Sequence, residues 1–125
     1  MLQFETIYGN VVAKANHYMA VPDGCGGRRF IKDEAIRQYE DNFKRQCVTY
    51  ANKGITGAFR FIADVYFITD KSDLDNALKT LLDCLQYCGA IADDNKCVSI
   101  EARKHIDRNR PRVRFALVPL EPTLF

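Results

Sequence analysis

Two pairs of acidic residues flank one predicted helix in the second half of the chain. Asp73 and Asp75 lie at its start, and Asp93 and Asp94 follow its end. Carboxylate oxygens are the ligands that Mg²⁺ prefers, and carboxylates brought together repel one another unless a cation neutralises them. A cation held in this way can activate water and stabilise the leaving oxygen of a phosphodiester, while Lys79 could offset charge on the transition state. The pattern is that of a possible metal-dependent nuclease site.

An ordinary structural role accounts for the same acids equally well. Acidic residues in the first turn of a helix interact favourably with its dipole, and an aspartate at the cap can accept hydrogen bonds from free backbone amides. Asp75 and Lys79 are four residues apart, the spacing of a common surface ion pair. Asp93 and Asp94 could belong to a solvated turn. The pattern alone does not favour one interpretation over the other.

Because of the expected length of the helix, it is difficult for the acids at its two ends to meet in a single cluster. Leucines at helical spacing predict a helix from about Leu74 to Cys88, with Ser72 or Asp73 as its cap and Gly89 just past its end. Such a helix of about 14 residues is roughly 21 Å long, whereas the segment from Gly89 to Asp94 reaches at most about 17 Å. Three arrangements could still complete a site. The helix could be shorter or tilted, Asp83 could bridge the gap, or Asp94 could come from a second subunit.

The remaining periodicities predict a single α+β domain covering residues 1–125, with a mixed β-sheet and two main helices in the order β-α-β-α-β-β. Strands are expected at 2–8, 57–69, 96–106 and 112–120, and helices at 31–54 and 74–88. The last two strands are predicted to form a hairpin through the turn residues 107–111. Residues 9–29 are predicted to be a long irregular segment.

Composition is that of an ordinary globular protein, with 47% hydrophobic and 27% charged residues. No apolar run approaches the ~20 residues that a membrane span needs, and the N-terminus lacks the basic segment of a signal peptide. The five cysteines, an odd number, are expected to be reduced thiols in a cytoplasm. Cys84 and Cys88 fall on an apolar helix face, so we expect them in the core and not as zinc ligands.

Basic residues are concentrated in two places, although the formal net charge is only +2. Arg28 and Arg29 end a glycine-rich stretch. Arg112 and Arg114 alternate with apolar residues, so one face of their strand is expected to be cationic; this face is either a solvated surface or, if the chain has a nuclease site, a track for phosphates. The larger basic group comprises Arg103, Lys104, His105, Arg108, Arg110, Arg112 and Arg114.

The acidic segment resembles the signature of the RusA-type Holliday junction resolvases, which reads D-x-D-N-x-x-K-x-x-x-D-x-L, then a glycine, then D-D before a strand. Two further segments, "GRRFIKDEAIRQYE" and "KANHYM", are similar to the family more weakly, and "GNVVAKANHY" lacks the proline that the family often has there. The signature positions in this chain are Asp73, Asp75, Asn76, Lys79, Asp83, Leu85, Gly89, Asp93 and Asp94.

The resemblance implies an Mg²⁺-dependent endodeoxyribonuclease, with Mn²⁺ as a possible substitute, that resolves four-way DNA junctions by paired nicks. The protein would be a homodimer, of a type frequent in phages and prophages, and would act in the cytoplasm of a bacterial or phage-infected cell. The resemblance implies that Asp73, Asp75 and Asp94 hold the metal and that Lys79 assists at the scissile phosphate, with Asp83 and Asp93 as further candidates. The expected DNA-binding residues are Lys14, Asn16, Arg28, Arg29 and Asn76.

Two other functions remain open from the sequence. One is a junction-binding protein without catalysis, although a chain that has lost its activity would be expected to lose acids from the signature, and this chain keeps them. The other is a nuclease acting on flaps or single strands.

Overall fold

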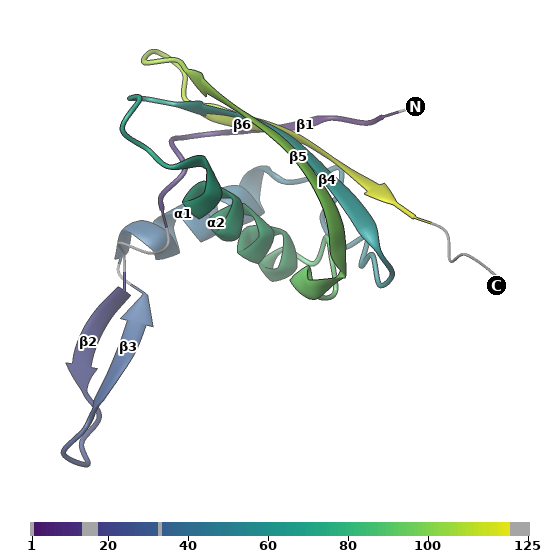
Figure 1. The fold of residues 1–125 in the computed structure, drawn as a ribbon. Helices are drawn as coiled ribbons and strands as arrows, with labels where there is room; N and C mark the ends of the chain where they lie inside the picture. Colours follow the sequence, from purple (N-terminus) through teal and green to yellow (C-terminus); the bar gives the residue numbers. More distant parts are fainter. Residues whose placement is uncertain (1, 14–17, 33, 121–125) are drawn as a thin grey trace.

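Two helices cover one face of a four-stranded sheet in the computed structural model, which describes residues 2–13, 18–32 and 34–120 (Figure 1). The strand order is β1-β6-β4-β5, and a separate two-stranded hairpin, β2–β3, projects from the body. The elements are β1 Glu5–Tyr8, β2 Tyr18–Pro22, β3 Arg28–Lys32, α1 Glu34–Gln46, β4 Phe59–Phe67, α2 Leu74–Tyr87, the 3₁₀ turn η2 Asp94–Lys96, β5 Cys97–Ile106 and β6 Arg112–Pro119.

Strand β4 forms the centre of the core. Its alternate residues from Phe59 to Phe67 are buried beneath the helices, and those between them are half-buried on the other face. Phe115 of β6 joins this layer by stacking on Phe43 of α1 with ring centroids 5.8 Å apart. The predicted α+β class and the order of the main elements are therefore confirmed. No helix of the described ranges is long and apolar enough to cross a membrane.

The region predicted to be irregular contains a hairpin. Strands β2 and β3 pair antiparallel from Tyr18 opposite Lys32 to Pro22 opposite Arg28. Asp23 organises the turn, because its Oδ1 accepts hydrogen bonds from the backbone amides of Cys25 and Gly27 at 2.8 and 3.0 Å. The glycines between these strands are typical of a loop, and in the structure they lie in the turn that connects the two strands.

The predicted hairpin between the last two strands is wrong. β5 pairs parallel to β4 and β6 pairs antiparallel to it, so β4 lies between them. The connection crosses the end of β4, where the Asp107 amide donates to the Phe67 carbonyl at 2.8 Å. β4 carries apolar residues on both faces, and a neighbouring strand on each side shields part of the face that the helices do not cover.

Helix α1 ends at Gln46, eight residues earlier than predicted, because a buried carboxylate accepts hydrogen bonds from the backbone amides that follow it. Glu5 on β1 accepts hydrogen bonds from the amides of Val48, Thr49 and Tyr50 at 2.7, 2.9 and 3.2 Å. The Cys47 thiol also donates to Glu5 at 3.3 Å. A hydrogen bond shared with Cys88, together with burial, raises the pKa of this thiol, which therefore stays protonated.

Helix α1 also covers the outer edge of β1. The Gln46 side chain accepts from the Tyr8 amide and donates to the Tyr8 carbonyl, each at 2.8 Å, as a neighbouring strand would. Asn42 donates to the same carbonyl at 2.9 Å. The backbone of Tyr8 at this edge of the sheet is consequently hydrogen-bonded within the chain.

We predict that Glu5→Ala lowers the free energy of unfolding by about 2–4 kcal/mol, because it leaves several amides without their acceptor. Urea denaturation followed by circular dichroism measures the effect. Glu34→Ala, at an exposed position in the first turn of α1, is the matched control and should change stability by less than about 0.5 kcal/mol. Equal effects of the two substitutions would contradict the assigned role of Glu5.

Candidate active site

Asp73 and Asp75 lie together at the start of α2, and both are exposed. Asp73 is the N-cap residue, yet its carboxylate makes no capping hydrogen bond to the helix backbone. It instead accepts a hydrogen bond from the Asn76 side chain at 3.3 Å. The helix therefore does not use the Asp73 carboxylate for capping, which leaves oxygen lone pairs of this group directed at solvent.

A cleft of about 290 Å³ opens beside Asp73. One wall is the segment after β1, residues 10–13, and the other is the start of α2 with Lys71 and Ser72. The Thr80 hydroxyl donates to the Val12 carbonyl at 2.7 Å and so ties this segment to α2. Lys14 and Asn16, two predicted DNA-binding residues, follow directly after this wall but lie outside the described residues.

Lys104 on β5 holds the segment that leads into Asp73. Its ammonium donates to the carbonyls of Asp70 and Ser72 at 2.7 and 2.6 Å and lies 5.8 Å from the centre of the Phe67 ring. Hydrogen bonds from a charged donor are stronger than those between neutral groups. Lys104 therefore fixes the start of α2 against the C-terminal end of β5.

Asp94 lies at the other end of α2. Its backbone amide donates to the Gln86 side chain at 3.1 Å, which places the carboxylate beside the last turn of the helix. Asp93 has a structural role in this turn, because it caps η2 by accepting from the Asn95 amide at 3.0 Å. The neighbouring Asp94 side chain is exposed.

Helix α2 thus keeps the acids of one chain in two places. Gln86 follows Asp75 by a little over three helical turns, or about 16 Å along the axis. The oxygens that share one Mg²⁺ each lie about 2.1 Å from it. No group of three His, Cys, Asp or Glu side chains within the described ranges is close enough to hold a metal. Asp83 lies half-buried in the middle of α2.

The donors at the start of α2 nevertheless fit a magnesium ion in their chemistry. They are carboxylate oxygens, they are exposed, and Mg²⁺ usually keeps several waters while it binds one or two carboxylates. Lys79 is also exposed and lies one helical turn after Asp75. Asp73 and Asp75 both lie at this end of α2, whereas Asp94 lies at the other end.

The two arginines predicted to form a phosphate track, Arg112 and Arg114, already contact other side chains of the chain. The Arg112 guanidinium lies over the Tyr66 ring, 3.7 Å from its centre, and forms an ion pair with Asp107 at 2.8 Å. The Arg112 hydrogen bond lowers the pKa of Asp107 below its usual value. Arg114 stacks on Phe4 at 3.8 Å. Arg28 is exposed on the projecting hairpin, and Arg29 lies on the same strand.

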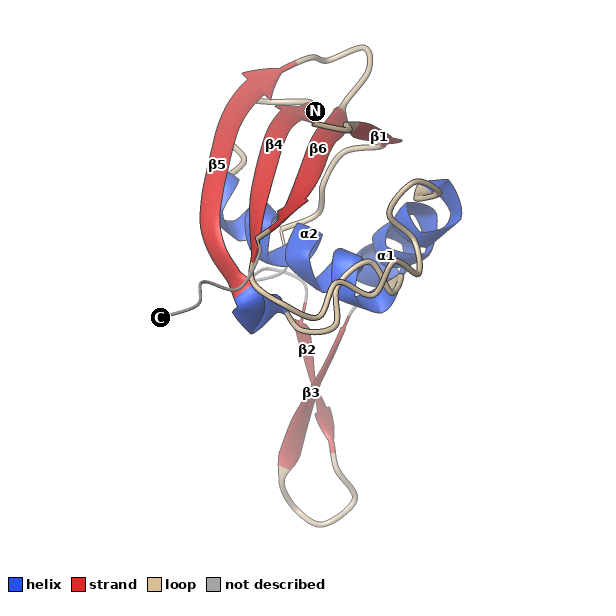
Figure 2. Cartoon of the chain, turned by 90° about the vertical axis from the view of Figure 1, so that its right-hand side faces the viewer, coloured by secondary structure: helices blue, strands red, loops and turns tan. Residues whose placement is uncertain are grey.

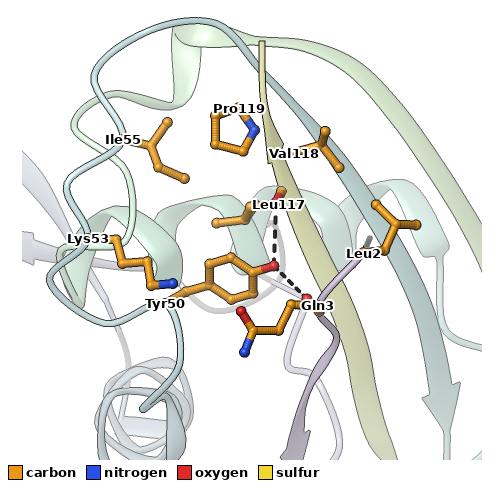
Figure 3. Close-up of a pocket in the computed structure, with 8 residues that line it drawn as sticks. All are labelled: Leu2, Gln3, Tyr50, Lys53, Ile55, Leu117, Val118 and Pro119. Atoms are coloured by element: carbon orange, nitrogen blue, oxygen red, sulfur yellow. Dashed lines mark hydrogen bonds between the residues drawn. The ribbon is translucent and has the colours of Figure 1, made fainter. Parts of the chain in front are cut away.

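A second cavity, of about 380 Å³, lies away from the acids (Figure 3). Tyr50 reaches across it, and its hydroxyl contacts the Gln3 carbonyl (Figure 3). The lining residues are otherwise mostly apolar, and Lys53 is the charged residue among them. This cavity contains no carboxylate, so it offers none of the oxygen ligands that a metal-dependent hydrolysis needs.

Two residues of the site were not identified from the sequence. Lys71 lines the cleft, and its position two residues before Asp73 is a signal that could have pointed to it. Lys104 is far from the signature along the chain, and only the pairing of β5 with β4 brings it to the carbonyls that it binds.

The sequence model of one protein family, described as Endodeoxyribonuclease RusA, matches residues 9–117 of the chain. No curated protein matches it. The match includes both ends of α2, the cleft and most of the sheet.

We predict that Lys104→Met loosens the segment before Asp73, because two carbonyls lose their charged donor. The stability of the fold should fall by about 1–3 kcal/mol, and peptides covering residues 68–76 should exchange their amide hydrogens faster. Hydrogen exchange with mass spectrometry measures the change. Lys53→Met, beside the second cavity, is the control and should leave exchange in this segment unaltered.

Proposed function

The chain belongs to the RusA endodeoxyribonuclease family, and from this premise we propose that it is a Mg²⁺-dependent homodimer that resolves four-way DNA junctions by paired nicks. Each of the two sites would be formed by Asp73 and Asp75 of one copy and Asp94 of the other. The family match makes the protein an endodeoxyribonuclease. The metal, the dimer and the paired cuts are our proposal.

The observation that carries the proposal is the Asp73 carboxylate, which stands at the N-cap of α2 without capping it. An aspartate retained for helix stability would be expected to bind a backbone amide there. Asp75, in the first turn of the helix, adds a second exposed carboxylate at the same end of α2. This supports a role in binding a cation over a role in stabilising the helix.

The roles of the individual residues follow from their positions. Bound Mg²⁺ supplies a more acidic water and a Lewis acid for the leaving oxygen. The Asn76 side chain holds the Asp73 carboxylate, and the Lys104 ammonium holds the backbone before it. Lys79 brings a positive charge to the side of the helix where the scissile phosphate would lie, which favours the more negative transition state. Lys71, in the cleft wall, would attract the phosphate backbone.

A dimer suits both the substrate and the separation of the acids. A four-way junction has two equivalent strands, and a two-fold symmetric dimer presents two equivalent sites to them. The length of α2 keeps Asp94 from the carboxylates of its own chain. A second copy supplies the missing ligand without any change in the fold of either chain.

We predict that Asp75→Asn lowers the rate of junction cleavage by at least about a hundredfold while leaving junction binding nearly unchanged, because an amide is a poor ligand for Mg²⁺ but keeps the shape of the side chain. Cleavage of labelled junctions in Mg²⁺ and gel-shift binding in its absence measure the two effects. Asp41→Asn on α1 is the matched control. Mg²⁺-dependent cutting by Asp75→Asn at the normal rate would refute the assignment.

The shared site has its own test, which uses mixed dimers. Asp75→Asn and Asp94→Asn should each be inactive alone, but their mixture should recover about a quarter of the wild-type nicking sites, since half of randomly formed dimers are mixed and each has one intact site. The recovered activity should nick one strand per junction. Mixing Asp75→Asn with the double variant Asp75→Asn/Asp94→Asn is the control and should recover nothing. If the first mixture is also inactive, the site is not shared between copies.

A further inference from the structure

We propose that the cleft beside Asp73 is a base subsite, which binds one base of the DNA, unstacked from its neighbours, next to the phosphate that is cut. This rests on the proposed function, which places Asp73 at that phosphate. The start of α2 would then select the position of the cut as well as hold the metal. Three properties of the cleft support the base subsite: its size, its rigidity and the groups that line it.

The cleft has the size of a small ligand. Its volume of about 290 Å³ lies at the lower end of the ~300–1,000 Å³ that is typical of small-molecule sites. A single base fits into such a space and a base pair does not, so the bound base has to leave its partner. Unpairing and unstacking a base is least costly where the duplex is already interrupted, as it is at a branch point.

Hydrogen bonds fix both walls of the cleft before any ligand binds. The segment after β1 passes from the sheet to the helix layer and lies there beside α2 (Figure 2). Asn10 holds one end of this wall, because its Oδ1 accepts a hydrogen bond from the Ile68 amide at 2.9 Å. The Thr80 hydroxyl holds Val12 near the other end, and the Lys104 ammonium holds the opposite wall. A preformed site of this kind binds its ligand without the entropy cost of ordering the walls.

The same hydrogen bonds determine which groups the cleft offers to a ligand. Since the Asn10 oxygen accepts from the backbone, its NH₂ group is the donor that this side chain offers. The Asn76 NH₂ group donates to Asp73 at 3.3 Å, so its oxygen is the corresponding acceptor. Asn10 and Asn76 line the cleft from its two walls, and Ser72 adds a hydroxyl that both donates and accepts. Donors and acceptors also lie side by side on the edge of a base, which amide and hydroxyl side chains therefore match.

The charge of the cleft favours a neutral ligand over a phosphate. Among the described residues that line it, Asp73 and Lys71 carry charge, and their formal charges cancel. A phosphate inside the cleft would lie against the Asp73 carboxylate, whereas a base has no charge for it to repel. The remaining side chains of the wall after β1 include the apolar Val11, Val12 and Ala13. Apolar side chains of this kind pack against the flat face of an unstacked base.

The cleft lies next to the proposed place of the cut. Asp73 belongs to the proposed metal site and also lines the cleft. A base and its phosphate are joined through one sugar, so a phosphate held at Asp73 brings a neighbouring base within reach of the cleft. Lys71 is exposed and can contact a phosphate outside the cleft while the base lies inside it. The base subsite would therefore make cleavage depend on DNA sequence as well as on DNA shape.

Junctions that lack single bases test the base subsite. Each nucleotide next to the branch point in the cut strands is replaced in turn by an abasic analogue, and gel shifts without metal give the dissociation constant. At one position, loss of the base should weaken binding by the wild type about tenfold. Ala13→Phe, which fills the cleft with a ring, should weaken binding to the intact junction by a similar factor. The abasic replacement should then change the dissociation constant of this variant less than about twofold.

Ala58→Phe is the matched control. Ala58 is also half-buried, and it lines a different cavity, formed with residues 54–57 and the end of β6. This variant should bind the intact and the abasic junctions as the wild type does. Ser72→Ala gives a second measurement if Ala13→Phe does not fold, which circular dichroism shows. It removes one hydroxyl from the cleft and should reduce the effect of the abasic replacement to about threefold.

The outcomes separate the base subsite from the proposed function. Abasic replacements that weaken the wild type and Ala13→Phe equally would overturn the base subsite. Weaker binding by Ala13→Phe, without dependence of the wild type on any base, would assign the cleft to the phosphate backbone and also overturn it. Because binding is measured without metal, a protein that shows the base dependence but never cuts a junction would refute the proposed function and leave the base subsite. A protein that cuts junctions without base dependence would overturn the base subsite alone.

Discussion

The rigidity and length of α2 constrain the whole site. A helix of fourteen residues cannot bring its two ends together, and hydrogen bonds at both of its ends keep the acids where they are. The Asp73 carboxylate accepts a hydrogen bond from a side chain of the first turn, while Asp94 is bound through its backbone beside the last turn. The acidic signature therefore covers α2 and the residues on either side of it. What each acid can bind depends on the structure next to its own end of the helix. In one chain, the neighbour of Asp73 is the cleft, and the neighbour of Asp94 is the beginning of the edge strand.

The sheet has two faces with different chemistry. The face beneath the helices is apolar and closely packed, with Phe61 and Phe115 at its centre. The open face carries cations that lie on aromatic rings, and His105 joins it by stacking on Tyr66 and bonding Asp64 at 2.9 Å. Cation–π contacts and ion pairs hold these side chains in place. A phosphate that binds near Arg112 or Arg114 would therefore meet cations that already have anionic or aromatic partners.

Much of the fold could be predicted from the sequence, because its strongest signals are local. The leucine spacing of α2, the alternation of β4 and the glycine after α2 each correspond to an observed element, and Gly89 has the positive φ of 81° expected past a helix end. The failures came from contacts between distant residues. Nothing near residue 47 indicates that Glu5 will end α1, and nothing in residues 96–120 indicates that β4 will separate two strands that a short turn connects. For the site, residue types and spacing single out the acids as candidates, and the helix length anticipated the separation of Asp75 from Asp94. The support from Lys104 depends on strand pairing, which the sequence does not specify.

The pairing of β1 with β6 has a consequence for how the protein folds during its synthesis. The first strand of the chain pairs with the last, from Glu5 opposite Phe115 to Tyr8 opposite Arg112. During synthesis, β1 cannot pair with β6 until nearly the whole polypeptide has left the ribosome. Pairing between such distant segments slows folding, because the chain loses much entropy before these contacts repay it. Completion of the sheet is thus a late event, and an incomplete chain that stops before β6 cannot assemble the central layer on which α2 and its carboxylates rest.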